Sequence, residues 1–111
     1  IINKLLEFVV KNTVIVHCPE LAIIKRIGSK EKILPSFKVK DPIISNFGAG
    51  DAFLAGALYG LINDFDDENI VNLGHASALN NLYSPDTISG AKSLEQLTYI
   101  IKNSEKNILK F

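Results

Sequence analysis

The sequence predicts an α/β fold on three observations. Short β-branched runs such as 13–16 are typical of buried strands. From Gly48 onward, apolar residues recur at helical spacing. The predicted order of helix, strand, hairpin, glycine-rich loop, helix and helix is that of an α/β protein. Two or three strands are too few to cover the apolar faces of these helices, so we expect further strands upstream or on a partner chain.

The N-terminal part of the chain is predicted to form one helix and three strands. The apolar residues of 1–11 fall on one helical face, which predicts an amphipathic helix. The run 13–16 predicts a buried strand of a parallel sheet. Segments 21–27 and 32–39 are predicted to pair as a hairpin, because Gly28-Ser29-Lys30 between them favours a turn.

A helix that follows Gly48 has the clearest periodicity in the chain. Its apolar residues lie at positions i, i+1, i+4, i+5, i+8 and i+9, namely Phe53, Leu54, Ala57, Leu58, Leu61 and Ile62. Ala52, Gly56 and Gly60 recur every four residues and predict a groove in which another backbone can approach closely. We therefore expect this helix to pack centrally.

Two more helices are predicted after it. The acidic stretch 66–68 suits the positive end of a helix dipole and predicts a helix that reaches about Tyr83. A solvated helix start explains these carboxylates better than a metal cluster does. Ser93 and Gln96 predict a capping box for a last helix over 94–102.

Composition and charge restrict the function classes. The chain has 111 residues, of which 47% are hydrophobic, enough for a globular core. Twelve basic and twelve acidic residues balance, so we expect a small-molecule ligand rather than nucleic acid or a membrane surface. Lys102, Lys106 and Lys110 are expected to form a solvated face. A single cysteine, Cys18, excludes an internal disulfide and is typical of a reduced thiol.

No segment has the features of a membrane anchor or a secretory signal. The most apolar stretch, 52–62, is shorter than the roughly 20 residues of a membrane helix. The run 1–12 has no basic leader and no small-residue cleavage site. We therefore expect a cytoplasmic protein. The chain also contains no methionine, which suggests that a preceding segment has been removed.

The most informative motif is Asn-Phe-Gly-Ala-Gly-Asp-Ala-Phe at 46–53, a glycine-rich turn that leads into the predicted helix. Gly48 and Gly50 let the backbone present successive N–H groups at the helix N-terminus, where donors and dipole attract a phosphate-like anion. The dipole also favours a carboxylate in the first turn, so Asp51 could accept a proton from a substrate hydroxyl. The motif therefore combines an anion hole with a base, as phosphoryl transfer requires.

A simpler interpretation of this motif is an ordinary loop in which Asp51 caps the helix. Spacing alone weights the two interpretations about equally. The motif is not a Walker A loop, since G-x-x-x-x-G-K is absent, and it is not a G-x-G-x-x-G dinucleotide turn.

The sequence GAGDAFLAGALYGL, which begins at Gly48, resembles the C-terminal signature of the pfkB (ribokinase-like) sugar and nucleoside kinases. The resemblance extends over most of the chain, because the elements around the motif follow the family's order. It implies the C-terminal part of a three-layer α/β/α fold, with residues 1–111 forming the nucleotide and anion-hole half of one kinase domain. It also implies that Gly48, Ala49 and Gly50 receive the γ-phosphate and that Asp51 deprotonates the acceptor hydroxyl.

The sequence departs from the family's pattern in three places. The family's nucleotide turn, T-L-G-x-x-G, corresponds to 17–22, where this chain has HCPELA and neither glycine. Ser45 stands where the family often has an Asp that helps bind a monovalent cation, so potassium activation is not carried over. The family's substrate-binding half precedes this region and is not in the sequence.

His75 lies in the stretch 74–80, on the helix after the signature. The resemblance implies that this stretch lines the adenine pocket, so His75 and Ala78 are candidate nucleotide-binding residues. The alternative is a helix that packs through small residues around a buried histidine. His17, beside Cys18, is expected to be structural, because two such residues do not make a zinc site.

We therefore expect an ATP-dependent kinase that phosphorylates a hydroxyl of a sugar, sugar phosphate or nucleoside, with ATP and Mg²⁺ as the phosphoryl donor. One alternative is a non-catalytic nucleotide-binding or regulatory module of the same fold. Another is a split enzyme whose other half is a separate chain. The sequence identifies neither the acceptor nor the oligomeric state, and a homodimer is one option.

Overall fold

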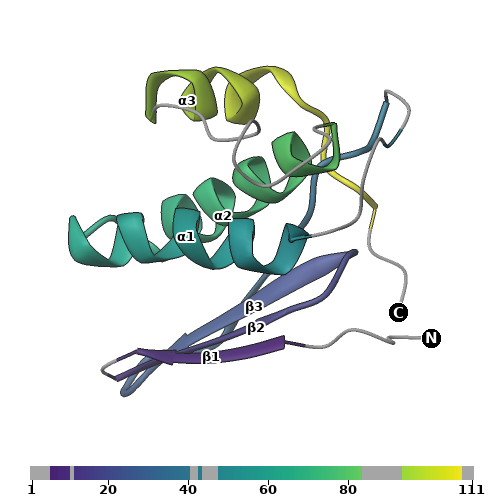
Figure 1. Ribbon diagram of the computed structural model, residues 1–111. Coiled ribbons are helices and arrows are strands. Elements are labelled where there is room, and N and C mark those ends of the chain that lie inside the picture. The colour runs from purple at the N-terminus through teal and green to yellow at the C-terminus, as the bar shows by residue number, and fades with distance from the viewer. Residues whose placement is uncertain (1–5, 11, 41–42, 44–47, 84–93, 109–111) are drawn as a thin grey trace.

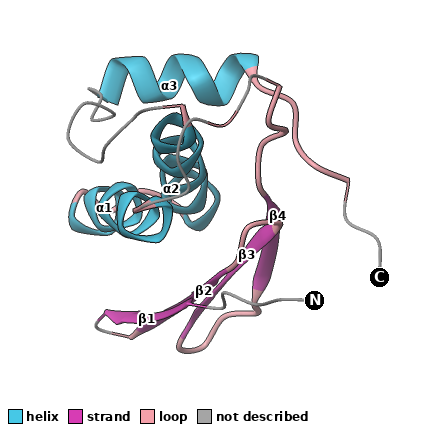
Figure 2. Cartoon of the chain, turned by 45° about the vertical axis from the view of Figure 1, so that its right-hand side comes forward, coloured by secondary structure: helices cyan, strands magenta, loops and turns pink. Residues whose placement is uncertain are grey.

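The computed structural model describes residues 6–10, 12–40, 43, 48–83 and 94–108. Among these, four strands form one sheet, and all three helices lie on the same side of it (Figures 1 and 2). The mixed α/β prediction is therefore confirmed. The elements are β1 (Leu6–Val10), β2 (Thr13–His17), β3 (Leu21–Arg26), β4 (Lys32–Pro35), α1 (Ala49–Ile62), α2 (Asp67–Leu82) and α3 (Leu94–Asn103).

All neighbouring strands of the sheet are antiparallel, in the order β1-β2-β3-β4. The prediction of a parallel strand at 13–16 is therefore wrong. The reason is geometric, because parallel neighbours need a crossover of a dozen or more residues. Far fewer residues separate each of these strands from the next.

The predicted helix over 1–11 is also wrong for the part that the structure describes. Residues 6–10 form β1, in which Val9 pairs with Val14 and Val10 with Thr13. Aromatic and β-branched residues favour a strand here, and two residues between β1 and β2 suffice for a hairpin. Residues 1–5 lie outside the described part of the chain.

The hairpin between β3 and β4 is confirmed, with Gly28 in the left-handed region at φ 84°. That conformation suits glycine because it has no Cβ. The second strand is shorter than predicted, since β4 ends at Pro35. Phe37 continues only as an isolated bridge to Lys106.

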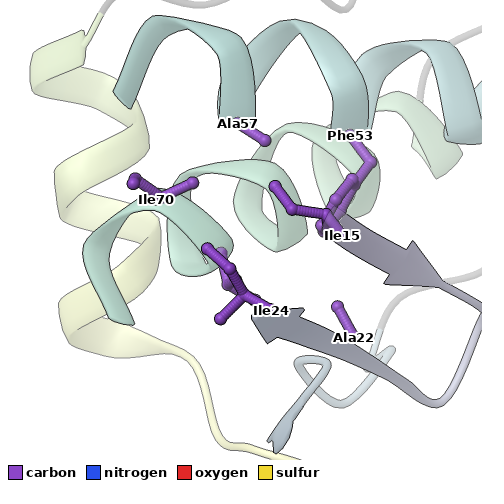
Figure 3. Packing of buried hydrophobic residues seen from close by; sticks show 7 residues of the cluster. Ile15, Ala22, Ile24, Phe53, Ala57 and Ile70 are labelled. Atoms are coloured by element: carbon purple, nitrogen blue, oxygen red, sulfur yellow. The ribbon is translucent and has the colours of Figure 1, made fainter. Parts of the chain in front are cut away.

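The main core lies between the sheet and the first two helices (Figure 3). Alternate residues of β2 and β3 point toward the helices, as the burial of Ile15, Ala22 and Ile24 shows. They meet buried side chains from both helices, namely Phe53, Ala57, Ile70 and Val71.

The predicted small-residue groove on α1 is present and faces α2. A Cβ added at Gly56 would lie 2.5 Å from the backbone oxygen of Leu73, and one at Gly60 would lie 3.0 Å from Ile70 Cγ1. However, α2 is the more central helix, because α1 leaves Tyr59 and Ile62 exposed on its outer side. The expectation that α1 packs centrally is therefore wrong.

The starts and ends of the helices largely follow the sequence prediction. Asp66 caps α2, and its side chain accepts a hydrogen bond from the backbone N–H of Asn69 at 2.8 Å. Helix α3 ends at Asn103, close to the predicted end. The predicted cap at Ser93 lies outside the described residues. No helix in the described ranges is long and apolar enough to cross a membrane.

The face of the sheet that points away from the helices is largely apolar, although Glu7, opposite Val16, and Lys25, opposite Val14, also lie on it. Val16, Ile23 and Ile33 lie opposite one another on three neighbouring strands, and Val9 lies opposite Val14. Their side chains are half-buried or exposed. Because strand residues alternate between faces, these five side chains form one apolar surface, here called the outer sheet face.

We expect Gly56→Ala to destabilise the chain, although alanine is the better helix former. In an exposed helix this change would gain up to about 1 kcal/mol. Here the new methyl group meets a backbone carbonyl, so the free energy of unfolding should fall by about 1–3 kcal/mol in urea denaturation.

The matched control for this substitution is Ala55→Gly, on the exposed side of the same helix. It should cost about 1 kcal/mol through helix propensity alone. A neutral or stabilising Gly56→Ala would contradict the close contact between the two helices.

Candidate active site

One cleft of about 640 Å³ opens between the start of α1, the end of β2, one side of α2 and the segment after β4. Its volume is in the range of small-molecule sites. Every site residue predicted from the sequence lines this cleft, namely Gly48, Ala49, Gly50, Asp51, His75 and Ala78. The fold therefore brings together two stretches that are separated in the sequence by most of α1 and the first half of α2.

The first turn of α1 borders this cleft. Gly48 is the N-cap residue, at φ 81°, and its carbonyl accepts the first helical hydrogen bond from Ala52 at 2.9 Å. The N–H groups of Ala49, Gly50 and Asp51 precede that bond and have no partner within the helix. Among the described residues, no side chain caps this end, in contrast with α2. The turn is thus free to bind an anion through backbone N–H groups.

Asp51 is the third residue of α1 and its side chain is exposed. Because Gly48 is the N-cap residue, Asp51 does not cap this helix. Its carboxylate makes no hydrogen bond or ion pair with the described residues. The geometry is therefore compatible with a base beside the anion-binding turn, and the catalytic role stays a prediction.

Two histidines line the inner wall of the cleft next to Phe53. The ring of His17 stacks on Phe53 with centroids 4.1 Å apart, and the ring of His75 meets Phe53 edge-on at 5.3 Å. His75 Nε2 lies 3.0 Å from the carbonyl oxygen of Leu34, so in the neutral ring this nitrogen donates. The Nδ1 atoms of both histidines are buried without a hydrogen-bond partner in the described chain.

Burial keeps both histidines neutral near pH 7. Desolvation lowers the pKa of His17 from 6.5 to about 4. Desolvation also lowers the pKa of His75 to about 3, with smaller contributions from the nearby charges of Lys106 and His17, while the bond to Leu34 opposes the shift. At 2% exposure, His75 fits the interpretation as a buried packing residue. Its contact with a nucleotide stays a prediction.

Sequence reasoning missed the place of His17 in this cleft. The residue was expected to be structural, and its stacking on Phe53 agrees with that, but the ring also lines the cleft. Its position as the first residue of HCPELA, where the family has its nucleotide turn, was the available indication.

The rim of the cleft is held by a segment from the C-terminal end of the described chain. Asn107 donates from Nδ2 to Ser36 Oγ at 2.7 Å, and Ser36 Oγ donates to the carbonyl oxygen of Pro19 at 2.8 Å. These bonds fix the turn between β2 and β3 at the cleft edge. Nothing periodic in the sequence around Asn107 indicates this role.

Lys106 lies in the same C-terminal segment and is tied to the cleft wall. Its Nζ donates to the carbonyl oxygen of Pro35 at 2.8 Å and to Asn72 Oδ1, and it lies 4.4 Å from the ring centroid of Phe37. Desolvation lowers the pKa of Lys106 to about 8. The predicted solvated face is therefore wrong at this position.

The other two lysines of the predicted solvated face are Lys102 and Lys110. Lys102 is exposed, as expected, and Lys110 lies outside the described residues. The helical spacing was misleading because α3 ends before Lys106, so the three residues do not share one helix.

The acidic stretch at the start of α2 has structural roles. Asp66 caps the helix, and Asp67 pairs with Arg26 at the end of β3. In the part of the chain that the structure describes, no group of three or more His, Cys, Asp or Glu side chains is arranged to hold a metal ion.

The family model for pfkB family carbohydrate kinases matches residues 1–94. This chain belongs to the pfkB carbohydrate kinase family. The match includes the Gly48 turn, Asp51 and both histidines of the cleft, so the resemblance proposed from the GAGD signature is confirmed at the level of the family.

Two known proteins are similar to this pfkB chain. A 5-dehydro-2-deoxygluconokinase from Shouchella clausii (strain KSM-K16) is 34% identical over 67 residues, which cover 54% of this chain and 21% of that protein. A crystal structure assigned provisionally as a 2-keto-3-deoxygluconate kinase from Enterococcus faecalis matches with a TM-score of 0.53 and 14% identity. That match covers 96% of this chain and 29% of the solved one.

The structural match confirms the ribokinase-like fold class predicted for the chain. The pfkB chain spans about a fifth of the length of the curated relative and under a third of the solved kinase. Within the described residues, helices cover only one face of the sheet (Figure 2).

The two histidines should make stability depend on pH. Each has a lower pKa in the folded chain than the 6.5 of the unfolded chain, so below pH 6.5 the unfolded chain binds more protons. Stability should therefore fall as the pH decreases, until about pH 4 for His17 and about pH 3 for His75. Each histidine contributes a slope approaching about 1.4 kcal/mol per pH unit.

Urea denaturation of the chain between pH 7.5 and 5 measures this slope. The lower limit keeps the experiment above the range in which Glu105, whose pKa is lowered by Lys40 and Lys38, contributes. His17→Gln should leave the slope of one histidine only. A pH-independent free energy of unfolding over this range would contradict the buried, neutral state of both rings.

Proposed function

We propose that this chain supplies the phosphate-binding turn and the general base of an ATP-dependent kinase that acts on a hydroxyl of a sugar, sugar phosphate or nucleoside. One observation carries the proposal. N–H donors at the start of α1 and the carboxylate of Asp51, neither of which has a partner among the described residues, border the same cleft. Family membership supports a carbohydrate acceptor.

In the proposed reaction, the acceptor hydroxyl gives its proton to the carboxylate of Asp51 as its oxygen attacks the γ-phosphorus. A new oxygen–phosphorus bond forms, the bond from the γ-phosphorus to the bridging oxygen breaks, and ADP leaves. The N–H groups of Ala49 and Gly50 stabilise the charge on the transferred group. ATP enters as its Mg²⁺ complex, which is a substrate here.

The rest of the cleft suits the base of a nucleotide. Its walls carry the apolar side chains of Phe37, Val39 and Leu79 together with Ala78, and His75 forms part of the inner wall. Such a surface can hold a flat ring by desolvation and stacking. We propose that the adenine lies against Ala78 and His75, with the phosphates at the Gly48 turn.

One specific observation favours a second candidate function, a non-catalytic nucleotide-binding module. The turn at 17–22 carries Pro19 and Ala22 in place of the family's two glycines, and Pro19 and its neighbour Glu20 line the cleft. A carboxylate at this edge would weaken the binding of a polyphosphate. ATP binding without any phosphoryl transfer would favour this second function.

We also propose that the chain is one part of a longer kinase domain. The outer sheet face is apolar, and no described helix covers it. Apolar sheet faces of this kind are normally packed against a further layer. This chain covers only 21% of the curated relative and 29% of the solved kinase, which also supports a longer kinase domain.

The general base can be tested in a chimera, in which this chain replaces the matching segment of the Shouchella clausii kinase. Asp51→Asn should lower the turnover of 5-dehydro-2-deoxygluconate by about 10²–10⁴-fold, because the amide keeps the shape but cannot take the proton. The affinity for ATP, measured by calorimetry, should change little.

The matched control is Asp64→Asn at the far end of α1, where an asparagine tolerates the φ of 57°. It should leave the turnover unchanged. Full turnover in Asp51→Asn would remove Asp51 from the mechanism. If Asp64→Asn lowered the turnover as strongly as Asp51→Asn, the loss would reflect folding rather than the loss of a base.

The missing layer can be tested in trans. The Shouchella clausii kinase without its matching segment should form a complex with this chain, detected by size-exclusion chromatography with light scattering. Ile23→Lys on the outer sheet face should abolish the complex, because it would bury an unpaired charge. Lys32→Glu, exposed on β4, is the control that should leave it intact. A complex that tolerates Ile23→Lys would show that this face is not the contact.

A further inference from the structure

Asn107 is a polar residue of the cleft wall whose side-chain amide is held in one orientation. Its Nδ2 atom lies 2.7 Å from Ser36 Oγ and 3.4 Å from the carbonyl oxygen of Phe37. The hydroxyl of Ser36 donates its proton to the carbonyl oxygens of Pro19 and Glu20, at 2.8 Å and 3.0 Å. Both neighbours of the amide can therefore only accept from it, so its N–H groups face them.

This orientation leaves the amide oxygen of Asn107 for a ligand. The Nδ2 atom is engaged by acceptors of the chain itself, whereas Oδ1 accepts no hydrogen bond from the described residues. Asn107 is half-buried, and Oδ1 is not one of the buried unpaired atoms of the described chain, so this oxygen is accessible. Asn107 also lines the cleft, which therefore has a neutral acceptor on its wall.

The backbone around Asn107 is fixed as well as its side chain. Its N–H donates to the carbonyl oxygen of Ser36 at 2.8 Å, and the N–H of Lys38 donates to the carbonyl oxygen of Glu105 at 2.7 Å. These bonds hold the segment after α3 against the segment after β4 (Figure 1). A group held in place before binding loses little conformational entropy when a ligand contacts it.

The wall next to Asn107 is the apolar part of the cleft. Its Nδ2 contacts the backbone of Phe37, and the ring of Phe37 meets the ring of His75 edge-on, with centroids 6.3 Å apart. Under the proposed function, the adenine lies against His75 and Ala78. Asn107 therefore belongs to the same wall as the proposed base site.

Other polar side chains of the cleft are less suited to contact the edge of a neutral base. The Nε2 atom of His75 is engaged by a backbone carbonyl oxygen, and its Nδ1 atom is buried. The hydroxyl of Ser36 is committed to the bonds that orient Asn107. Glu20 and Asp51 are exposed, so water competes for their carboxylate oxygens.

We propose that Asn107 selects the base of the bound nucleotide, because its Oδ1 accepts a hydrogen bond from an exocyclic amine such as the one at position 6 of adenine. The inference rests on the proposed function, since it requires a nucleotide in the cleft. Guanine and hypoxanthine carry a carbonyl oxygen at position 6, which would place two acceptors against each other. The two-bond contact that asparagine can form with adenine is not available, because Nδ2 is already engaged.

Three nucleotides that differ at position 6 of the purine test this contact. ATP carries an amine there, purine riboside triphosphate carries a hydrogen atom, and ITP carries a carbonyl oxygen. Isothermal titration of the full chain with their Mg²⁺ complexes should show that ATP binds about two- to tenfold more tightly than purine riboside triphosphate, as expected for one neutral hydrogen bond. ITP should also bind less tightly than ATP.

Asn107→Ala removes the acceptor and should bring the affinities for ATP and purine riboside triphosphate to within about twofold of each other. The matched control is Asn103→Ala at the exposed end of α3, where the amide donates to the carbonyl oxygen of Tyr99. This control should keep the preference for ATP.

If Asn107→Ala does not fold, carbon NMR of the unaltered chain replaces it. The resonance of the side-chain carbonyl carbon of Asn107 should differ between the complexes with ATP and with purine riboside triphosphate, because only ATP donates to Oδ1. The corresponding resonance of Asn103 should be the same in both complexes.

The outcomes separate this inference from the proposed function. Equal affinities for ATP and purine riboside triphosphate overturn the role of Asn107 and leave the nucleotide site intact. A preference for ATP that Asn107→Ala retains, or an identical Asn107 carbonyl resonance in the two complexes, has the same meaning. No binding of any of the three triphosphates overturns the proposed function and this inference with it.

Discussion

The close packing of α1 on α2 fixes the geometry of the rest of the molecule. At Gly74 a Cβ would lie 2.6 Å from the ring of Phe53, so this ring rests directly on the backbone of α2. Phe53 in turn carries the stacked ring of His17 at the end of β2. The two helices and the sheet thus meet around one aromatic ring. Since Phe53 lies one turn from the start of α1, the same contact sets where the N–H donors of that helix point.

The elements that could be predicted from the sequence are those whose determinants are local. Helices α1 and α2, the hairpin at Gly28 and the cap at Asp66 each depend on residues within a few positions of one another. Whether neighbouring strands run parallel or antiparallel is not determined locally, because it depends on which strands become neighbours. The strand β1 shows the same limit, since its apolar spacing also fits a helix and pairing with β2 decides the outcome.

The residues of the candidate site divide in the same way, into those that a local pattern predicts and those that depend on distant contacts. The motif at Gly48–Asp51 and the residues His75 and Ala78 were predicted from sequence and share one cleft. The contributions of His17 and Lys106 were not predicted, because each depends on contacts with distant segments. Lys106 bonds Asn72 and Pro35, which are 34 and 71 positions away along the chain. No local pattern encodes such contacts, and burial, which lowers the pKa of both side chains, arises only from them.

The exposure of Asp51 has a consequence for how a kinase could be assembled from this chain. The apolar wall and the uncapped helix start lie within the cleft, while the carboxylate is at its border and open to solvent. Under the proposed function, an acceptor hydroxyl must therefore approach Asp51 from the side that the described residues leave open. Phosphoryl transfer also requires that water be excluded from the acceptor position, since water would otherwise compete for the phosphoryl group. Under the proposed function, the polypeptide that covers the outer sheet face would also have to provide the acceptor site, because the described chain offers donor-side groups alone.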